Sequence, residues 1–308
     1  MPEEYQYTNT PAFRKFKASK AFEDSKVRKL VVRVEQYRDL FIELRQHMDD
    51  PVQHFTLPAL EKTNNIEKTV DTAVDTTRKW ICIKEPLDFE KLKELLEEKG
   101  VFVFLTGKYK GWSYIEQAFR GLTITHSTTP VIIINNSDSK KAQSFTLMHE
   151  LGHLIRGDTS IDGKSTTDAD IEKWCDLFSG KMLMPAHSEF WQRLVSNDLA
   201  DIKRLAQQFK VSPYACLVRL RQLQKIDQQT YSELEAKLDD EYKKLKEKQK
   251  NRSGGAQRDR VKEVRTQFGT PFINTVLTAW HSQEITLHKA TKLLDLKRPQ
   301  QFLDLGVS

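Results

Sequence analysis

Near the middle of the chain, the sequence runs Phe145-Thr-Leu-Met-His-Glu-Leu-Gly-His153. Its apolar residues recur at helical spacing and continue to Ile155, which predicts an α-helix. Ser137-Asp-Ser-Lys140 supplies capping residues ahead of this helix, and Gly157 is its expected end. A polar loop should follow, from 157 to about 168.

His149, Glu150 and His153 form the pattern H-E-x-x-H inside this predicted helix. Residues four apart lie on one face of a helix, so both imidazole rings can meet a single metal ion. Glu150 is rotated by about 100° from His149, where it can take a proton from a bound water without occupying a coordination position. Gly152 has no side chain and lets another segment approach the helix closely. Two core histidines would give the same pattern, so a second constraint is needed.

A second helix, predicted over 170–184 and ended by Pro185, supplies that constraint. Glu172 can donate one carboxylate to the metal, and Asp176, one turn later on the same face, can accept the ring N–H of a ligand histidine. Two histidines and one glutamate leave a fourth position for water, which is the arrangement of a catalytic zinc site. We therefore predict His149, His153 and Glu172 as metal ligands, Glu150 as the general base and Asp176 as their support. Zinc and manganese both remain open, because two imidazoles and one carboxylate can hold either ion.

The elements ahead of the motif indicate the fold class. Helices are expected over 26–48, 64–80 and 89–99, and strands over 101–105, 118–125 and 130–135. This order predicts an α+β fold, with a small mixed or antiparallel sheet flanked by helical N- and C-terminal regions. The strand Val131–Asn135 is a candidate edge against which an extended peptide could lie, with a simple interior strand as the alternative.

Shifts in composition divide the chain into four parts. We predict an N-terminal helical arm (1–60), a metallopeptidase core (61–195), a helix-turn-helix-like extension (196–250), and a basic linker with a C-terminal helical cap (251–308). The segment 199–221 has the pattern of a DNA-reading unit, with Arg219 and Arg221 near its end. The same pattern is also a common packing device.

Composition limits the partners and the compartment. The net charge of +6 permits an acidic partner or DNA without requiring one. Cys82, Cys175 and Cys216 form no C-x-x-C pair, which fits a reducing compartment, and we predict the last two as small buried residues. The N-terminus does not resemble a signal peptide, and no apolar run approaches the roughly 20 residues that span a bilayer. A cytoplasmic protein without a membrane partner is expected.

The chain resembles the ImmA/IrrE family of metallo-endopeptidases in two segments, Phe145–His153 and Ile171-Glu-Lys-Trp-Cys-Asp-Leu-Phe-Ser-Gly-Lys-Met-Leu-Met-Pro185. The strand ending in Asn135 and the helical segment Leu205–Leu220 fit the same family pattern. The resemblance implies a zincin-like core, zinc on His149, His153 and Glu172, catalysis by Glu150, and an anti-repressor role through cleavage of a transcriptional repressor. Members often carry an N-terminal repressor-type helix-turn-helix. This chain begins after that position, so the DNA-binding partner is expected to be a separate protein.

The chain departs from the family pattern at three places. Gln143-Ser144 stand where an arginine is common, Cys175-Asp176 replace the usual Ala-Asn pair, and Lys181 replaces an acidic residue.

Two other functions remain open from the sequence alone. One is a regulatory binding module that sequesters a repressor or antitoxin without cleaving it, and the other is a DNA-binding regulator that uses 199–265. For a protease, the tetrahedral oxyanion also needs a donor besides the metal, and His126, His187 and Tyr214 are the candidates.

Overall fold

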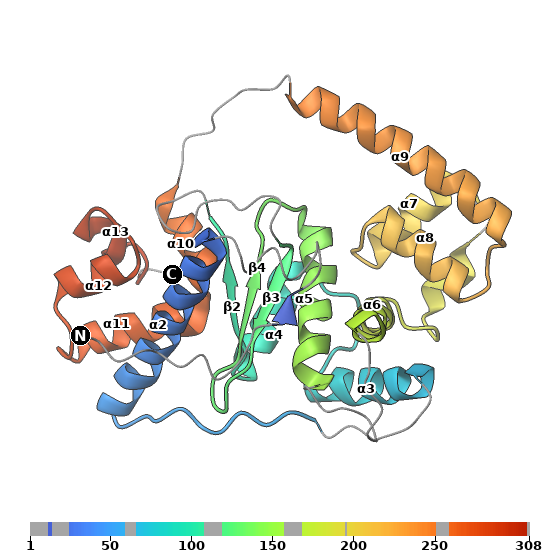
Figure 1. Ribbon diagram of the computed structural model, residues 1–308. Helices are drawn as coiled ribbons and strands as arrows, with labels where there is room; N and C mark the ends of the chain where they lie inside the picture. Colours follow the sequence, from blue (N-terminus) through green and yellow to red (C-terminus); the bar gives the residue numbers. More distant parts are fainter. Residues whose placement is uncertain are drawn as a thin grey trace.

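The computed structural model describes residues 12–13, 25–58, 66–107, 119–156, 168–194, 196–250 and 259–306. Within these ranges, a central sheet separates two helical layers (Figure 1). The loop predicted after residue 156 and most of the linker predicted after residue 250 lie outside the described residues, as does most of the segment before residue 25.

The sheet has four strands in the order β1-β3-β4-β2. They are β1 (Ala12–Phe13), β2 (Phe102–Leu105), β3 (Gly121–Ile124) and β4 (Val131–Ile134). Strands β2 and β4 run parallel, whereas β3 is antiparallel to both β4 and β1. The sheet is therefore mixed, and the predicted α+β fold class is confirmed.

Two alternatives were open for Val131–Asn135, an edge strand and an interior strand, and the structure shows the interior strand. Strand β4 lies between β3 and β2, with Ile133 opposite both Leu122 and Phe104. All four of its residues are buried, and an unbroken β-branched run suits a strand covered on both faces. Strand β3 pairs with β4 along one side. In the described chain, its other side pairs with the two residues of β1.

Alternate residues of a strand point to opposite faces of a sheet, and here each face has its own hydrophobic core. One core holds Val103, Leu105, Ile132 and Ile134 with α3 (Ile66–Trp80), α4 (Phe89–Glu98), α5 (Lys140–Arg156), α6 (Asp168–Leu183), η2 (Glu189–Arg193), α7 (Leu199–Gln208), α8 (Pro213–Gln222) and α9 (Gln228–Lys250). The other holds Phe102, Phe104, Val131 and Ile133 with α2 (Ser25–His47), α10 (Arg260–Phe268), α11 (Thr270–His281), α12 (Leu287–Leu293) and α13 (Pro299–Leu303).

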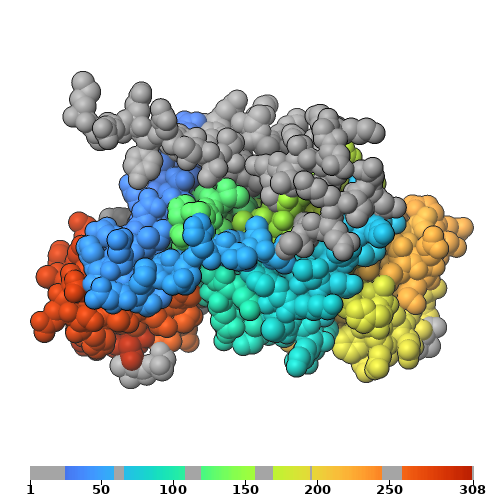
Figure 2. Space-filling view, turned by 90° about the horizontal axis from the view of Figure 1, so that it is seen from below, coloured from blue at the N-terminus to red at the C-terminus, as the bar shows by residue number. Residues whose placement is uncertain are grey.

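The second layer joins the two ends of the described chain. The ring of Tyr37 on α2 meets those of Phe268 and Phe272 edge to face, with centroids 5.2 and 5.3 Å apart. Arg33 forms an ion pair of 2.6 Å with Asp295. Figure 2 shows the surface of α2 beside that of the C-terminal helices. Helix α2 and the C-terminal helices thus share one core.

The helices that carry the motif residues have nearly the predicted bounds, since α5 and α6 each begin and end within a few residues of the expected positions. In the described part of the chain, no helix has both the length and the apolar character that crossing a bilayer requires.

Candidate active site

Helix α5 lies on one face of the sheet, and α6 packs against it on the side away from the sheet (Figure 1). The hydroxyl of Ser139 accepts a hydrogen bond of 3.3 Å from the backbone N–H of Ala142 and caps the start of α5. A Cβ added to Gly152 would lie 3.2 Å from Cδ1 of Phe178 and 3.3 Å from Sγ of Cys175. Gly152 therefore permits the close approach of α6, as predicted.

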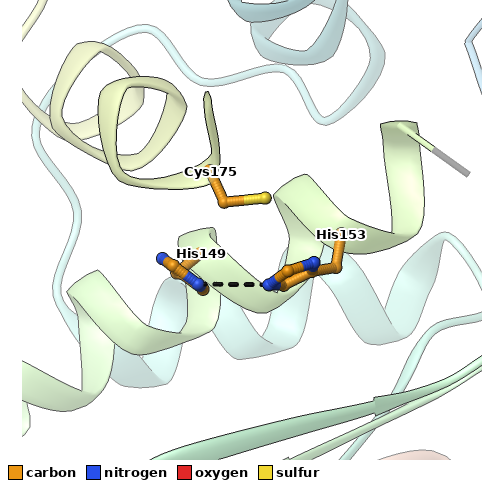
Figure 3. A group of neighbouring side chains, drawn as sticks. All are labelled: His149, His153 and Cys175. Atoms are coloured by element: carbon orange, nitrogen blue, oxygen red, sulfur yellow. Dashed lines mark hydrogen bonds between the residues drawn. The ribbon is translucent and has the colours of Figure 1, made fainter. Parts of the chain in front are cut away.

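The two histidines of the motif converge on one point. Their Nε2 atoms lie 3.2 Å apart, and both side chains are almost completely buried (Figure 3). Two ring nitrogens at this distance repel each other unless a proton or a cation lies between their lone pairs. A proton or a cation between the two ring nitrogens would therefore stabilise the observed arrangement of His149 and His153.

Glu172 on α6 faces both rings. Its two carboxylate oxygens each lie 3.4 Å from a ring nitrogen, Oε2 from Nε2 of His149 and Oε1 from Nε2 of His153. Burial alone would raise the pKa of Glu172, but hydrogen bonds and charge attraction from the two histidines lower this pKa to about 2. The carboxyl group is therefore held as an anion, the form that binds metal.

Asp176 lies one turn beyond Glu172 and reaches the opposite side of the first ring. Its Oδ1 is 2.9 Å from Nδ1 of His149. A carboxylate at this position accepts the Nδ1–H and so leaves the lone pair of Nε2 available to a metal. This is the contact that the four-residue spacing of the two acidic residues predicted.

The side chain of Cys175 also lies near His149 and His153, and this proximity was not predicted from the sequence. Its Sγ and one ring nitrogen from each of His149 and His153 lie within 4.8 Å of one another (Figure 3). The side chain is fully buried, and burial raises the pKa of the thiol well above its ordinary value, with a further contribution from the charges of Glu150 and Glu172. The sequence reading of Cys175 as a small buried residue is correct about its burial but missed this proximity.

Glu150 points toward the sheet. Its Oε2 accepts a hydrogen bond of 2.8 Å from the hydroxyl of Thr123 on β3, and the residue is fully buried. A Cβ added to Gly121 on the same strand would lie 2.6 Å from Cγ and Oε1 of Glu150, so a larger residue at position 121 would displace this carboxylate. Strand β3 thus fixes the position of the Glu150 carboxylate through Thr123 and Gly121.

The three oxyanion candidates have different surroundings. Nδ1 of His126 accepts hydrogen bonds from the backbone N–H groups of Thr128 and Thr129, at 3.3 and 3.2 Å, and so shapes the turn between β3 and β4. His187 is exposed. The hydroxyl of Tyr214 donates a hydrogen bond of 3.0 Å to Glu235.

Among the three, Tyr214 shares a cavity with the site. This cavity of about 250 Å³ adjoins Asp176 and lies between the first turns of α5, the middle of α6 and α8; its lining includes Phe145, Asp176, Gly180, Tyr214 and Val218.

The departures from the family pattern have structural roles. Nε2 of Gln143 donates hydrogen bonds to Oδ1 of Asn136 and to the carbonyl of Asp138, at 3.1 and 2.8 Å, and ties the start of α5 to the loop ahead of it. Lys181 forms an ion pair of 2.6 Å with Asp71 on α3. Gln143 and Lys181 thus each have a polar partner outside their own helix.

The helix-turn-helix-like segment consists of α7 and α8. Arg219, a candidate base-reading residue, is 4% exposed and donates from Nε to the carbonyl of Met184 at 3.0 Å. Burial lowers the pKa of Arg219 to about 10. Cys216 is buried as predicted, and burial raises its pKa to about 12. In the structure, Arg219 joins α8 to the end of α6 and does not face outward toward DNA.

The comparisons with known proteins agree with this geometry. Residues 107–221 match the model of a peptidase family described as the IrrE N-terminal-like domain. The matched segment contains β3, β4, α5, α6, α7 and α8, and with them all the residues around the histidine pair. A search of curated proteins found no match. Residues 107–221 thus carry an IrrE N-terminal-like domain, and this match supports the resemblance to the ImmA/IrrE family.

Proposed function

We propose that the protein is a zinc-dependent endopeptidase that hydrolyses a peptide bond in a protein substrate. His149, His153 and Glu172 hold the metal, Glu150 is the general base, and Asp176 orients His149. The peptidase family of residues 107–221 supports the reaction class. The assignment of each role rests on the geometry around the histidine pair.

The observation that carries the proposal is the set of distances between the donor atoms. The three donors are separated by 3.2, 3.4 and 3.4 Å. In a tetrahedral zinc site with bonds of about 2.0–2.2 Å, neighbouring donors lie about 3.3–3.5 Å apart. Two neutral imidazoles and one carboxylate are also a donor set that suits zinc. The residues present therefore fit the ion that the family implies.

When bound, the metal would polarise the scissile carbonyl and acidify a water molecule. Glu150 accepts the proton of the attacking water and then returns it to the leaving amine nitrogen. The hydrogen bond from Thr123 fixes the carboxylate of Glu150 during both transfers. Asp176 keeps His149 in the tautomer that presents Nε2 as a donor.

The edge of β3 is the place that we propose for the substrate. An extended peptide can add to an exposed strand through backbone hydrogen bonds. Strand β1 pairs antiparallel with β3 at Leu122 and Thr123, so this edge already accepts a strand in that direction. Because Thr123 also contacts Glu150, a peptide paired there would lie next to the general base.

The proposed substrate is a helix-turn-helix transcriptional repressor, and its cleavage would relieve repression. The choice of substrate extends the resemblance to the ImmA/IrrE family, which also implies a cytoplasmic location. We also propose that the metallopeptidase core spans residues 61–195. The arrangement of Arg219 favours this function over direct DNA recognition by α8, because its guanidinium is buried against Met184.

The test is an incubation of the purified protein with a candidate repressor, with and without a chelator, followed by electrophoresis. We expect cleavage that the chelator abolishes and added zinc restores. Glu150→Gln should retain zinc and lose proteolysis by a factor of about 10² to 10⁴, as expected for removal of a general base. His149→Ala should lose the metal. Cleavage by Glu150→Gln at the wild-type rate would exclude Glu150 as the base, and stable binding without cleavage would favour the sequestering module.

A further inference from the structure

Helix α6 presents three chemically active side chains to α5, at positions i, i+3 and i+4. These are Glu172, Cys175 and Asp176. Residues at this spacing share one face of a helix, and in the structure all three lie near the histidine pair. The proposed ligand set uses Glu172 and its support uses Asp176. Cys175 lies between them in sequence and has no role in the proposed reaction.

The position of Cys175 differs from that of an ordinary core cysteine. Its Sγ lies within 4.8 Å of a ring nitrogen of both His149 and His153, and the side chain is fully buried. Figure 3 shows the sulfur directed from α6 toward the space beside the two rings. Cys216, the other buried cysteine of the described chain, lies on α8 within an apolar face and is the natural comparison.

The close approach depends on a second residue. A Cβ at Gly152, in the turn between the two histidines, would come within 3.3 Å of Sγ of Cys175. The absence of a side chain at Gly152 thus leaves room for the sulfur beside the turn that carries the two histidines. Two features of different helices, a glycine on α5 and a thiol on α6, meet at the metal site.

We propose that Cys175 is a fourth protein donor to the metal, which makes the centre a site of two histidines, one glutamate and one cysteine. The inference rests on the proposed metal site. A thiolate is a soft donor that favours zinc and disfavours manganese. His149, His153 and Glu172 can hold either zinc or manganese, and a bound thiolate from Cys175 makes the site prefer zinc. A fourth protein donor also closes the position that water needs, so the thiol must leave the metal before hydrolysis.

Cobalt(II) provides the test, because a four-coordinate cobalt ion has visible absorption bands and a bound thiolate adds a near-ultraviolet charge-transfer band. Metal-free protein is titrated with cobalt(II) in a Cys82→Ser background, since Cys82 is exposed. We expect one cobalt per chain with both absorption features. Cys175→Ala should keep the visible bands and lose the charge-transfer band, whereas Cys216→Ala should keep both.

Competition between zinc and manganese provides a second readout. Replacing Cys175 by Ala should lower the preference for zinc by about tenfold or more, on the scale by which residues around a metal alter its affinity. The same change at Cys216 should leave the preference unchanged.

The outcomes separate the two proposals. Visible bands without a charge-transfer band in the Cys82→Ser protein would overturn the role of Cys175 and leave the metal site standing. A charge-transfer band that persists in Cys175→Ala, or equal zinc preference in that variant, would also overturn it. Failure to bind cobalt at all would reject the proposed metal site itself.

Discussion

The hydroxyl of Thr123 donates a hydrogen bond of 2.8 Å to Oε2 of Glu150, and it also lies 3.0 Å from the backbone carbonyl of the same residue. One side chain of β3 thus contacts both the helix backbone and the proposed general base. Under the proposed function, strand β3 has two tasks, since it positions the base from the sheet and offers its outer edge to a peptide.

Removing this hydroxyl should weaken catalysis without removing the metal. In Thr123→Val, the carboxylate of Glu150 loses the hydrogen bond from the Thr123 hydroxyl, and we expect kcat to fall by about tenfold, less than the roughly 10² or more caused by loss of a base. Zinc content, measured on the purified variant, should stay at the wild-type value. Thr123→Ser keeps the hydroxyl and should retain most of the activity. Equal kcat in Thr123→Val and wild type would show that the contact does not support the base.

Asp176 should determine metal affinity through its contact with His149. Asp176→Ala removes the acceptor for Nδ1–H, and zinc affinity should fall by about 10- to 100-fold. Asp176→Asn still offers an oxygen acceptor, and it is the residue usual in the family, so its zinc affinity should stay much closer to wild type. Competition with a chromophoric chelator measures both values. An unchanged affinity in Asp176→Ala would contradict this role.

The depressed pKa of Glu172 predicts a pH dependence in the metal-free protein. A carboxyl whose pKa falls from 4.5 to about 2 on folding stabilises the fold at pH values above 4.5. This contribution is lost as the pH falls from 4.5 through about 2, where the folded state also takes up the proton. Thermal unfolding of metal-free wild type should therefore lose more stability over that range than Glu172→Gln. Parallel curves for the two proteins would show that Glu172 has no such interaction.

Strand β1 should compete with substrate for the edge of β3. A protein that starts at Ser25 lacks β1, and we expect a several-fold lower KM for a peptide substrate with little change in kcat. A full-length variant in which residues 1–24 are replaced by a Gly/Ser stretch is the matched control for length, because Gly and Ser have low strand propensity. It should behave like the shortened protein. A higher KM in both variants would instead show that the segment helps to hold the substrate.

Local spacing predicted which side chains come together, because the relevant residues lie one turn apart on two helices. His149 with His153, and Glu172 with Asp176, needed helical periodicity alone. The close packing of the two helices was also readable from Gly152. By contrast, the partners of a strand depend on distant residues. The run Val131–Ile134 looks the same at an edge as in the interior, and its neighbours come from other parts of the chain.

Two side chains show a further limit of local reasoning. Cys175 lies three residues after Glu172, a spacing that fits both a core position and a metal-site position, and only the distance between α5 and α6 separates the two. Arg219 has the charge of a surface residue, but the carbonyl of Met184 receives its Nε–H in the interior. Neither contact has a signal in the sequence nearby.

The sheet contributes one face to each of two hydrophobic cores, and a fragment limited to the matched peptidase domain would lose part of both. A fragment cut to residues 107–221 would retain β3 and β4 but lose β2, α2 and all the helices after α8. Ile133 and Leu122, each fully buried in the whole chain, would then face water on one side. Exposed apolar strands of this kind invite aggregation. The excised fragment should therefore aggregate more readily than the entire polypeptide.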